Sequence, residues 1–183
     1  MSAVPAPQRE AAARSVARNV LASAQGLRVA IVAPGVALDV RRFALINGAR
    51  FLTEPEGSGI NGAIAFGVSH LAALGYDRVI VVNSELPFVR DISWLTNTDG
   101  VIVVPDHTGS QTNALSIPAG SGFRVAYGAN SFERHCAEAR RLGFDPRVVV
   151  DPDGISADST DFAPTLRTTA EVTIDTAESL KTP

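Results

Sequence analysis

Short apolar runs alternate along this chain with longer stretches in which apolar positions recur at helical spacing. The apolar runs are rich in valine and isoleucine and are bounded by turn residues, as in strands buried on both faces of a sheet. They predict strands at Leu27–Ala33, Arg50–Thr53, Arg78–Asn83, Gly100–Val104, Asn113–Ile117, Arg147–Val150 and Arg167–Ile174. The helical spacing predicts helices at Glu10–Ala24, at Val36–Asn47, at Ile60–Leu74, and from Asn130 or Ser131 to Leu142. This alternation indicates an α/β fold with a mostly parallel sheet.

The remaining segments fit a single domain over residues 1–183. Residues 1–8 predict a short tail or a residual first strand, and residues 151–164 predict a loop or extension. Gly75 is placed to end the preceding helix. Asp175 and Glu178 form a capping-box-like pattern, which predicts a final helix.

Composition excludes several classes of protein. The formal net charge is −3 and no basic stripe is present, so we expect no nucleic-acid partner. The single cysteine, Cys136, gives neither an internal disulfide nor a zinc cluster. No run is long and apolar enough to cross a bilayer, which predicts a cytoplasmic protein. Of sixteen basic side chains only Lys181 is a lysine, so the predicted core holds no ammonium group for nucleotide phosphates.

Two polar blocks carry the strongest functional signal. Residues 105–115 and 127–135 place hydroxyl, amide and glycine residues where apolar strands meet turns or a helix start. Backbone and hydroxyl donors in such positions suit an anionic ligand.

Acidic residues follow three of the predicted strands: Glu85, Asp106 and Asp175. Ligands of open α/β sheets bind beyond the carboxyl ends of strands, and converging carboxylates can hold magnesium. Helix capping explains Asp175 about as well, and turn formation is the more frequent role for an acid placed like Asp106.

The chain resembles the CofC/FbiD family of guanylyltransferases of coenzyme F-420 biosynthesis over roughly residues 9–180. The similarity lies in blocks that occur in the family's order: Gly59-Ile60-Asn61-Gly62-Ala63, Val81-Val82-Asn83-Ser84-Glu85-Leu86-Pro87, Thr112-Asn113-Ala114-Leu115, Tyr127-Gly128-Ala129-Asn130-Ser131-Phe132-Glu133-Arg134-His135 and Ile174-Asp175-Thr176-Ala177-Glu178-Ser179-Leu180. The resemblance implies a Rossmann-like nucleotidyltransferase (GT-A-like) three-layer sandwich. It also implies transfer of GMP from GTP to 2-phospholactate, phosphoenolpyruvate or 3-phosphoglycerate, with magnesium on the phosphates and release of pyrophosphate.

The family's sites map onto this chain residue by residue. The phospho-acid site maps onto Thr112, Asn113, Gly128 and Ser131. Guanine is expected near Gly59 and Asn61, although the same turn is an ordinary helix cap. Glu85 and Asp175 would hold magnesium and serve as the catalytic acids. His135 is expected to be a partly exposed structural residue, and not a base.

The sequence also departs from the family. Members open with a Val-Pro-Val-Lys strand and a Lys-Ser-Arg-Leu loop, of which only Val4-Pro5 is echoed here. Arg14 and Arg18 would have to replace the missing lysines. Glu85 stands where the family has aspartate, and Thr173 stands where it has a second aspartate beside Asp175.

Three functions remain open from the sequence. The first is the family's guanylyltransferase activity. The second is a catalytically impaired relative that binds a phospho-acid or regulates an intact partner, as a homodimer or a hetero-complex. The third is a nucleotidyltransferase or glycosyltransferase-like enzyme that uses another nucleotide.

Overall fold

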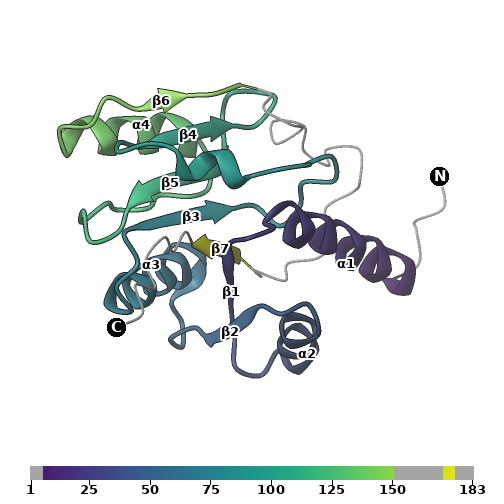
Figure 1. Cartoon of the computed structure of the whole chain (residues 1–183). Coiled ribbons are helices and arrows are strands. Elements are labelled where there is room, and N and C mark those ends of the chain that lie inside the picture. Colours follow the sequence, from purple (N-terminus) through teal and green to yellow (C-terminus); the bar gives the residue numbers. More distant parts are fainter. Residues whose placement is uncertain (1–5, 151–170, 176–183) are drawn as a thin grey trace.

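The computed structural model describes residues 6–150 and 171–175. Within those residues the strands form one seven-stranded sheet in the order β2-β1-β7-β3-β5-β4-β6 (Figure 1). The strands are β1 (Arg28–Ala33), β2 (Arg50–Thr53), β3 (Arg78–Val82), β4 (Ile102–Pro105), β5 (Thr112–Pro118), β6 (Arg147–Val148) and β7 (Glu171–Asp175). β2, β1, β3, β4 and β6 run in one direction, whereas β5 and β7 run in the other.

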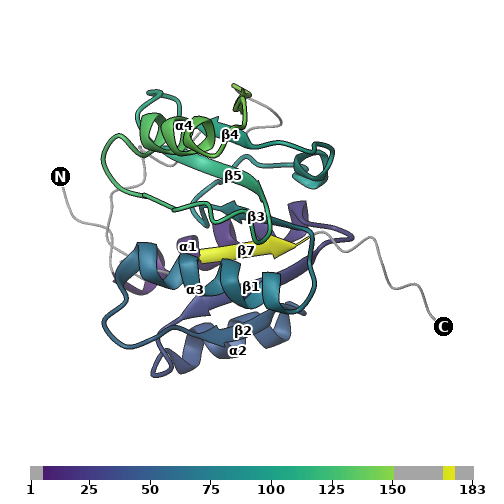
Figure 2. The same cartoon turned by 90° about the vertical axis from the view of Figure 1, so that its left-hand side faces the viewer.

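Helices cover both faces of the sheet and give three layers. They are α1 (Ala6–Ser23), α2 (Leu38–Ile46), α3 (Gly59–Ala73) and α4 (Ser131–Arg141), with a 3-10 turn at Ser93–Thr96. One apolar cluster joins α1, α2 and the 3-10 turn to the sheet, and a second joins α3 and α4 to its other face. Figure 2 shows α3 and α4 in front of the sheet and α1 behind it. The predicted three-layer α/β sandwich is therefore confirmed.

Local sequence explains the central strand and the end of α3. All five residues of β3 are buried, as its run of valine and isoleucine predicts. Gly75 follows α3 with φ +87°, a left-handed conformation that glycine adopts without steric cost. The Gly75 N–H donates to Ala72 O (3.0 Å), which closes the last turn.

The predicted boundaries differ from the observed ones mainly at the two ends. α1 begins at Ala6, so residues 6–8, expected in a tail, are helical. The last strand, Glu171–Asp175, includes Asp175, which was expected to cap a helix, and the predicted strand residues 167–170 lie outside the described residues. The predicted loop at 151–164 and the rest of that predicted final helix lie outside the described residues.

The position of β7 was not predicted. It lies between the parallel strands β1 and β3 and is antiparallel to both. In this register Glu171 is level with Val32 near the carboxyl end of β1, and Asp175 is level with Arg28 at the amino end. The two ends of β7 therefore lie at opposite edges of the sheet.

Candidate active site

A connected polar edge lies where β3 ends and β5 begins. The Asn83 N–H, directly after β3, donates to Asn113 O on β5 (2.8 Å). The Glu85 N–H donates to Asn83 Oδ1 (3.0 Å) in a turn that carries the chain away from the sheet. This pairing places Glu85 close to the predicted phospho-acid residues Thr112 and Asn113.

Thr112 connects this edge to the start of α4. Its N–H donates to Ser131 Oγ (3.0 Å), and its hydroxyl lies 2.9 Å from His135 Nδ1. Asn113 and these three residues are at most 3% exposed. The predicted cluster of Thr112, Asn113 and Ser131 is thus present, but it forms a buried anchor beneath the surface. His135, expected to be partly exposed, is fully buried because it fills the space between β5 and the segment before Gly128.

An exposed turn of residues 127–130 lies over this anchor. Gly128 has φ +110°, which only glycine adopts readily, and Asn130 has φ 56° directly before α4. The Arg134 guanidinium donates to Ala129 O (2.6 Å) and holds the turn from the helix side. The Ser131 N–H donates to Gly128 O (3.0 Å). The turn, called the Gly128 turn below, has one defined shape at the surface.

Asn61 fixes the Gly128 turn from the opposite side. Its Oδ1 accepts from Tyr127 N–H (2.6 Å) and its Nδ2 donates to Tyr127 O (3.2 Å). This pair brings the start of α3, with Gly59, next to the Gly128 turn, as a shared site requires. It also engages both polar atoms of Asn61, so reading a guanine edge with this side chain would require the pair to open.

Asp106 organises the loop between β4 and β5. Its Oδ1 accepts from the N–H groups of Ser110 (2.8 Å) and Gln111 (2.9 Å), and its Oδ2 accepts from the Thr108 hydroxyl (2.7 Å). Burial acts to raise the pKa of Asp106, but the hydrogen bonds from Gln111, Thr108 and Ser110 outweigh it and lower the pKa. Turn formation, the alternative favoured by the sequence, is therefore the role of Asp106.

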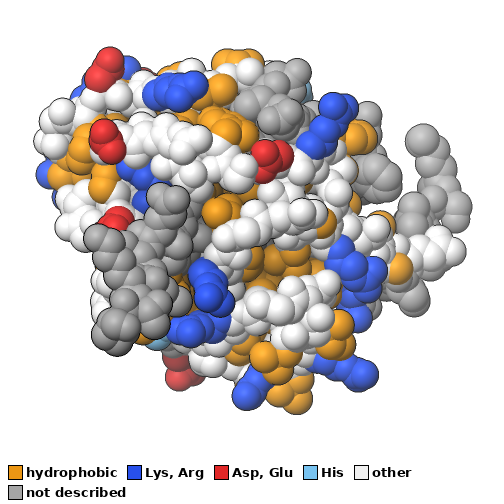
Figure 3. Space-filling model, in the orientation of Figure 1, with side chains coloured by type: hydrophobic (Ala, Val, Ile, Leu, Met, Phe, Trp, Pro, Cys, Tyr) orange, Lys and Arg blue, Asp and Glu red, His pale blue; other side chains and the backbone are white. Residues whose placement is uncertain are grey.

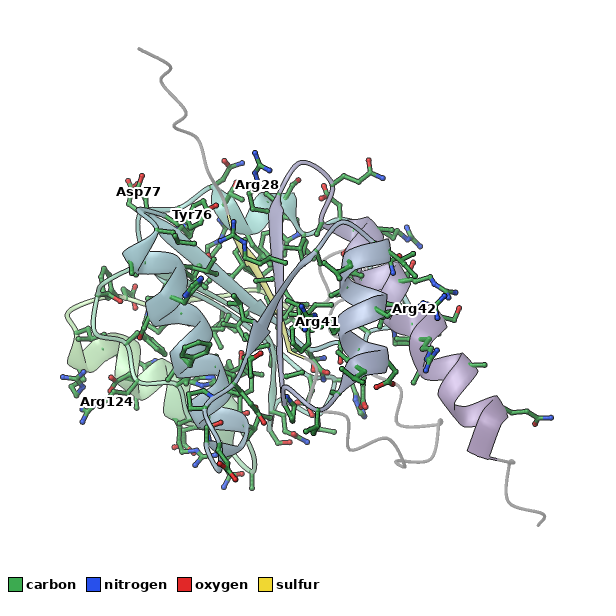
Figure 4. The ribbon with its side chains drawn as sticks, turned by 90° about the horizontal axis from the view of Figure 1, so that it is seen from below. Arg28, Arg41, Arg42, Tyr76, Asp77 and Arg124 are labelled. Carbon is green, nitrogen blue, oxygen red and sulfur yellow. The ribbon has the colours of Figure 1, made fainter. Side chains whose placement is uncertain are left out.

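The predicted magnesium pair is not brought together. Glu85 lies beyond the carboxyl end of β3, whereas Asp175 is level with Val79 near its amino end. The four-residue step from Val79 to Asn83 spans roughly 13 Å at about 3.3 Å per residue. Figure 4 shows Arg28 and Asp77, which mark that amino edge, together at one end of the sheet. Glu85 and Asp175 therefore do not form one magnesium site, because they lie at opposite ends of the strands.

Glu85 by itself is an exposed carboxylate whose pKa is raised by the surrounding protein, which reduces its hydration. In the described part of the chain, no group of three or more acidic, histidine or cysteine side chains could hold a metal ion. The carboxylate nonetheless lies at the same edge as Thr112. Of the predicted acid pair, Glu85 is therefore the residue at the same edge as the phospho-acid residues.

The arginines expected on the triphosphate lie on the other face of the sheet. Arg14 pairs with Asp39 of α2 (3.4 Å), and both arginines line a depression of about 400 Å³ between α1 and α2. Apolar and basic side chains gather over α2 at the lower right of Figure 3. They include Leu38, Arg42 and Ile46. Because α3 and α4 cover the opposite face, Arg14 and Arg18 are not joined to Gly59 and Asn61 in one site.

Sequence reasoning missed the contributions of Tyr127 and His135. Tyr127 acts through its backbone, which pairs with Asn61. His135 bonds to β5 and to the segment before the Gly128 turn. Both residues stand in the polar block 127–135, which could have indicated their roles. Within this block only Gly128 and Ser131 were predicted to bind the acid.

This arrangement can hold an anion. Exposed glycine and amide groups surround the Gly128 turn, hydroxyl groups lie directly beneath it, and Arg134 adds a positive charge on α4. Backbone donors at the start of a helix favour phosphate and carboxylate groups. Among the described residues, none of the helices has the length and apolar character that crossing a membrane requires.

Comparison with known proteins gives consistent results. Residues 2–161 match the family model described as "Guanylyl transferase CofC like". The chain is 42% identical over 73 residues to a phosphoenolpyruvate guanylyltransferase of Roseiflexus castenholzii, covering 39% of this chain and 34% of the relative. It is 31% identical to a 3-phospho-D-glycerate guanylyltransferase of Phenylobacterium zucineum, covering 67% of this chain and 58% of the relative. The chain thus spans less than two thirds of the length of these relatives.

The fold also matches a solved structure. A protein of Desulfovibrio desulfuricans G20, described as a nucleotide-diphospho-sugar transferase, superposes with a TM-score of 0.61 and 18% identity. The match covers 80% of this chain and 71% of that one. At this identity the likeness concerns the fold alone, and it agrees with a Rossmann-like nucleotidyltransferase architecture.

Proposed function

The chain belongs to the CofC-like guanylyltransferase family, and on that premise we propose that it transfers GMP from GTP to a phosphorylated three-carbon acid. The proposed acceptors are phosphoenolpyruvate, 3-phosphoglycerate and 2-phospholactate, which share a carboxylate and a phosphate. The phosphate oxygen of the acid would attack the α-phosphorus of GTP, and pyrophosphate would leave with the electron pair of the broken bond. We also propose that this step serves coenzyme F-420 biosynthesis and takes place in the cytoplasm.

One observation carries the proposal: the predicted substrate residues form one hydrogen-bonded edge. It runs from Asn61 through Tyr127 to the Gly128 turn, and from Ser131 through Thr112 to β5. These residues come from α3, β5 and α4, which are distant in sequence. Their convergence at the carboxyl edge of β3 is where open α/β sheets bind ligands.

We also propose that magnesium takes part in the reaction, although Glu85 and Asp175 are not positioned to hold one ion together. Because Glu85 and Asp175 lie at opposite edges, no catalytic step is assigned to a metal held between them. The chain's own residues would bind and orient the acid. This lowers the entropic barrier to attack of the acid's phosphate oxygen on the α-phosphorus of GTP. Glu85, at the same edge, is a candidate for contact with the nucleotide side of the reaction.

The test is a calorimetric titration with phosphoenolpyruvate, then with GTP, with and without magnesium, followed by an assay for pyrophosphate release. Release that requires GTP and one of the three acids, and that ATP does not replace, would establish the activity. Acid binding without GTP binding would contradict nucleotide transfer and favour a phospho-acid-binding subunit. If neither phosphoenolpyruvate nor GTP binds, the proposed phospho-acid site is contradicted as well.

The same samples decide the assembly. We propose a homodimer or a complex with an intact relative as the state to look for, and light scattering measures it directly. A monomer that releases pyrophosphate would show that no partner is required.

A further inference from the structure

His135 is the buried centre of the network beneath the Gly128 turn. Its side chain is fully enclosed, yet both ring nitrogens have polar partners. Nε2 accepts from the Ala126 N–H (2.9 Å), just before the Gly128 turn, and Nδ1 lies 2.9 Å from Thr112 Oγ1. The ring of Tyr127 packs edge-on against the imidazole at 4.7 Å. His135 therefore connects the segment before the Gly128 turn to β5.

The direction of each hydrogen bond follows from the donors available. The Ala126 N–H can only donate, so Nε2 must be the unprotonated nitrogen. A neutral imidazole then carries its proton on Nδ1 and donates it to Thr112 Oγ1. Burial, with the nearby Arg134 charge, lowers the pKa of His135 to about 4, while Glu138 acts in the opposite direction. The ring is therefore neutral at physiological pH.

This direction leaves two hydroxyl groups as donors. Thr112 Oγ1 accepts from His135, and Ser131 Oγ accepts from the Thr112 N–H. Among the described residues no acceptor is recorded for either hydroxyl proton, so each is available to an incoming group. Thr112 and Ser131 are 3% and 1% exposed, so a ligand reaches these hydroxyl groups only when the residues that cover them move.

We propose that His135 is a positioning residue of the phospho-acid site. It holds the Thr112 hydroxyl as a donor and fixes where the Gly128 turn begins, so that the site selects a group that only accepts hydrogen bonds. Such a group is a fully ionised phosphate or carboxylate. This inference rests on the proposed function, in which the Thr112–Ser131 cluster binds the acid.

Two substitutions separate the two contacts of His135. His135→Asn can still donate from its amide to Thr112 Oγ1, but it leaves the buried Ala126 N–H without an acceptor. His135→Gln can accept from Ala126 N–H, but it leaves Thr112 without its donor. Each loses one buried hydrogen bond, so we expect the KM for phosphoenolpyruvate to rise about tenfold in each variant. We expect the KM for GTP to change much less, because neither hydrogen bond of His135 is made to Gly59 or Asn61, the candidates for the nucleotide.

Thr112→Val tells the contacts apart. In this background His135→Gln should add nothing further to the KM for phosphoenolpyruvate, whereas His135→Asn should still raise it. Cys136→Ala is the matched control. Cys136 is a buried neighbour on α4 whose side chain belongs to the apolar cluster and not to the hydrogen-bond network of His135, so its truncation should lower the melting temperature and leave both KM values unchanged.

A separate readout does not depend on turnover. The ¹⁵N shifts of the His135 imidazole in the ligand-free protein should show protonated Nδ1 and unprotonated Nε2. Protonation on Nε2, or His135 variants that are folded and keep the wild-type KM for phosphoenolpyruvate, would overturn the proposal. Absence of turnover in the wild type would instead contradict the proposed function. In that case calorimetric affinity for phosphoenolpyruvate replaces KM, and equal affinity in wild type and folded variants would overturn the role of His135.

Discussion

Asp175 of β7 lies directly opposite Arg28 of β1 in the antiparallel strand register, at the far end of the sheet from Glu85. The backbone positions of the two acidic residues that the sequence assigns to one magnesium ion are thus separated by the length of β3. The separation follows from β7 running antiparallel to both of its neighbours. Because of this separation, substitutions of Glu85 and Asp175 should have different effects on activity.

We predict that Glu85→Gln lowers the rate of pyrophosphate release and that Asp175→Asn does not. Glu85 lies at the edge that carries Thr112, whereas Asp175 lies at the other edge. Initial rates measured across a magnesium titration check this. An equal loss of rate in both variants, with unchanged melting temperatures, would show that the two acids act together.

Asn61→Ala should destabilise the protein by about 1–3 kcal/mol, because it removes both hydrogen bonds between the Asn61 amide and the Tyr127 backbone. Urea unfolding followed by circular dichroism measures the change. Asn47→Ala is the matched control, since it removes one exposed hydrogen bond to Phe43 O (2.8 Å) and should change the free energy of unfolding much less. Similar losses in the two variants would contradict a bracing role for Asn61.

Gly128→Ala should weaken phosphoenolpyruvate binding, because alanine at φ +110° costs about 1–3 kcal/mol of backbone strain. Space is not the obstacle, since the nearest atom to an added Cβ, Arg134 Nη2, lies at 3.7 Å, which is ordinary van der Waals contact. Calorimetric affinity and melting temperature are the measurements. Gly26→Ala, at φ +82° and away from the edge, is a control that should show the same strain without the loss of affinity.

Stability should fall as the pH drops from about 6.5 to about 4, in part because of His135. The folded-state pKa of about 4 lies below the ordinary value of 6.5, so the unfolded state binds more protons in this window. The difference amounts to roughly 3 kcal/mol, lost as the pH falls. Unfolding free energies of wild type and His135→Gln at pH 7 and pH 4.5 measure it. The variant should lose less on acidification, and an equal loss in both would contradict the depressed pKa.

The sequence predicted most elements of the fold because the pattern of apolar residues reflects burial directly. Arg50–Thr53 matches β2 residue for residue, and the fully buried β3 was expected from its valines and isoleucines. The order and direction of strands are a different matter. The residues of β7 do not indicate that it pairs with β1 and β3, because strand pairing depends on contacts between segments that are distant in sequence.

The candidate site was predicted in its parts but not in its construction. Thr112 and Ser131 were chosen for their hydroxyl groups, and the structure joins them directly. Their burial, and the central position of His135, depend on how α4 packs against β5. The spacing of residues along the chain does not show how deeply a side chain is buried. His135 was therefore expected to be partly exposed, although it is fully buried.

The position of β7 also constrains how the molecule folds. β7 follows every other described strand along the chain, yet it lies between β1 and β3. The β2–β1 pair and the β3–β5–β4–β6 group have no direct strand pairing with each other without it. We therefore expect the two groups of strands to become one hydrogen-bonded sheet only after residues 171–175 have been synthesised. Because joining them closes a long loop, this step should be slow, and the exposed edges of β1 and β3 would be a place for chaperones to bind.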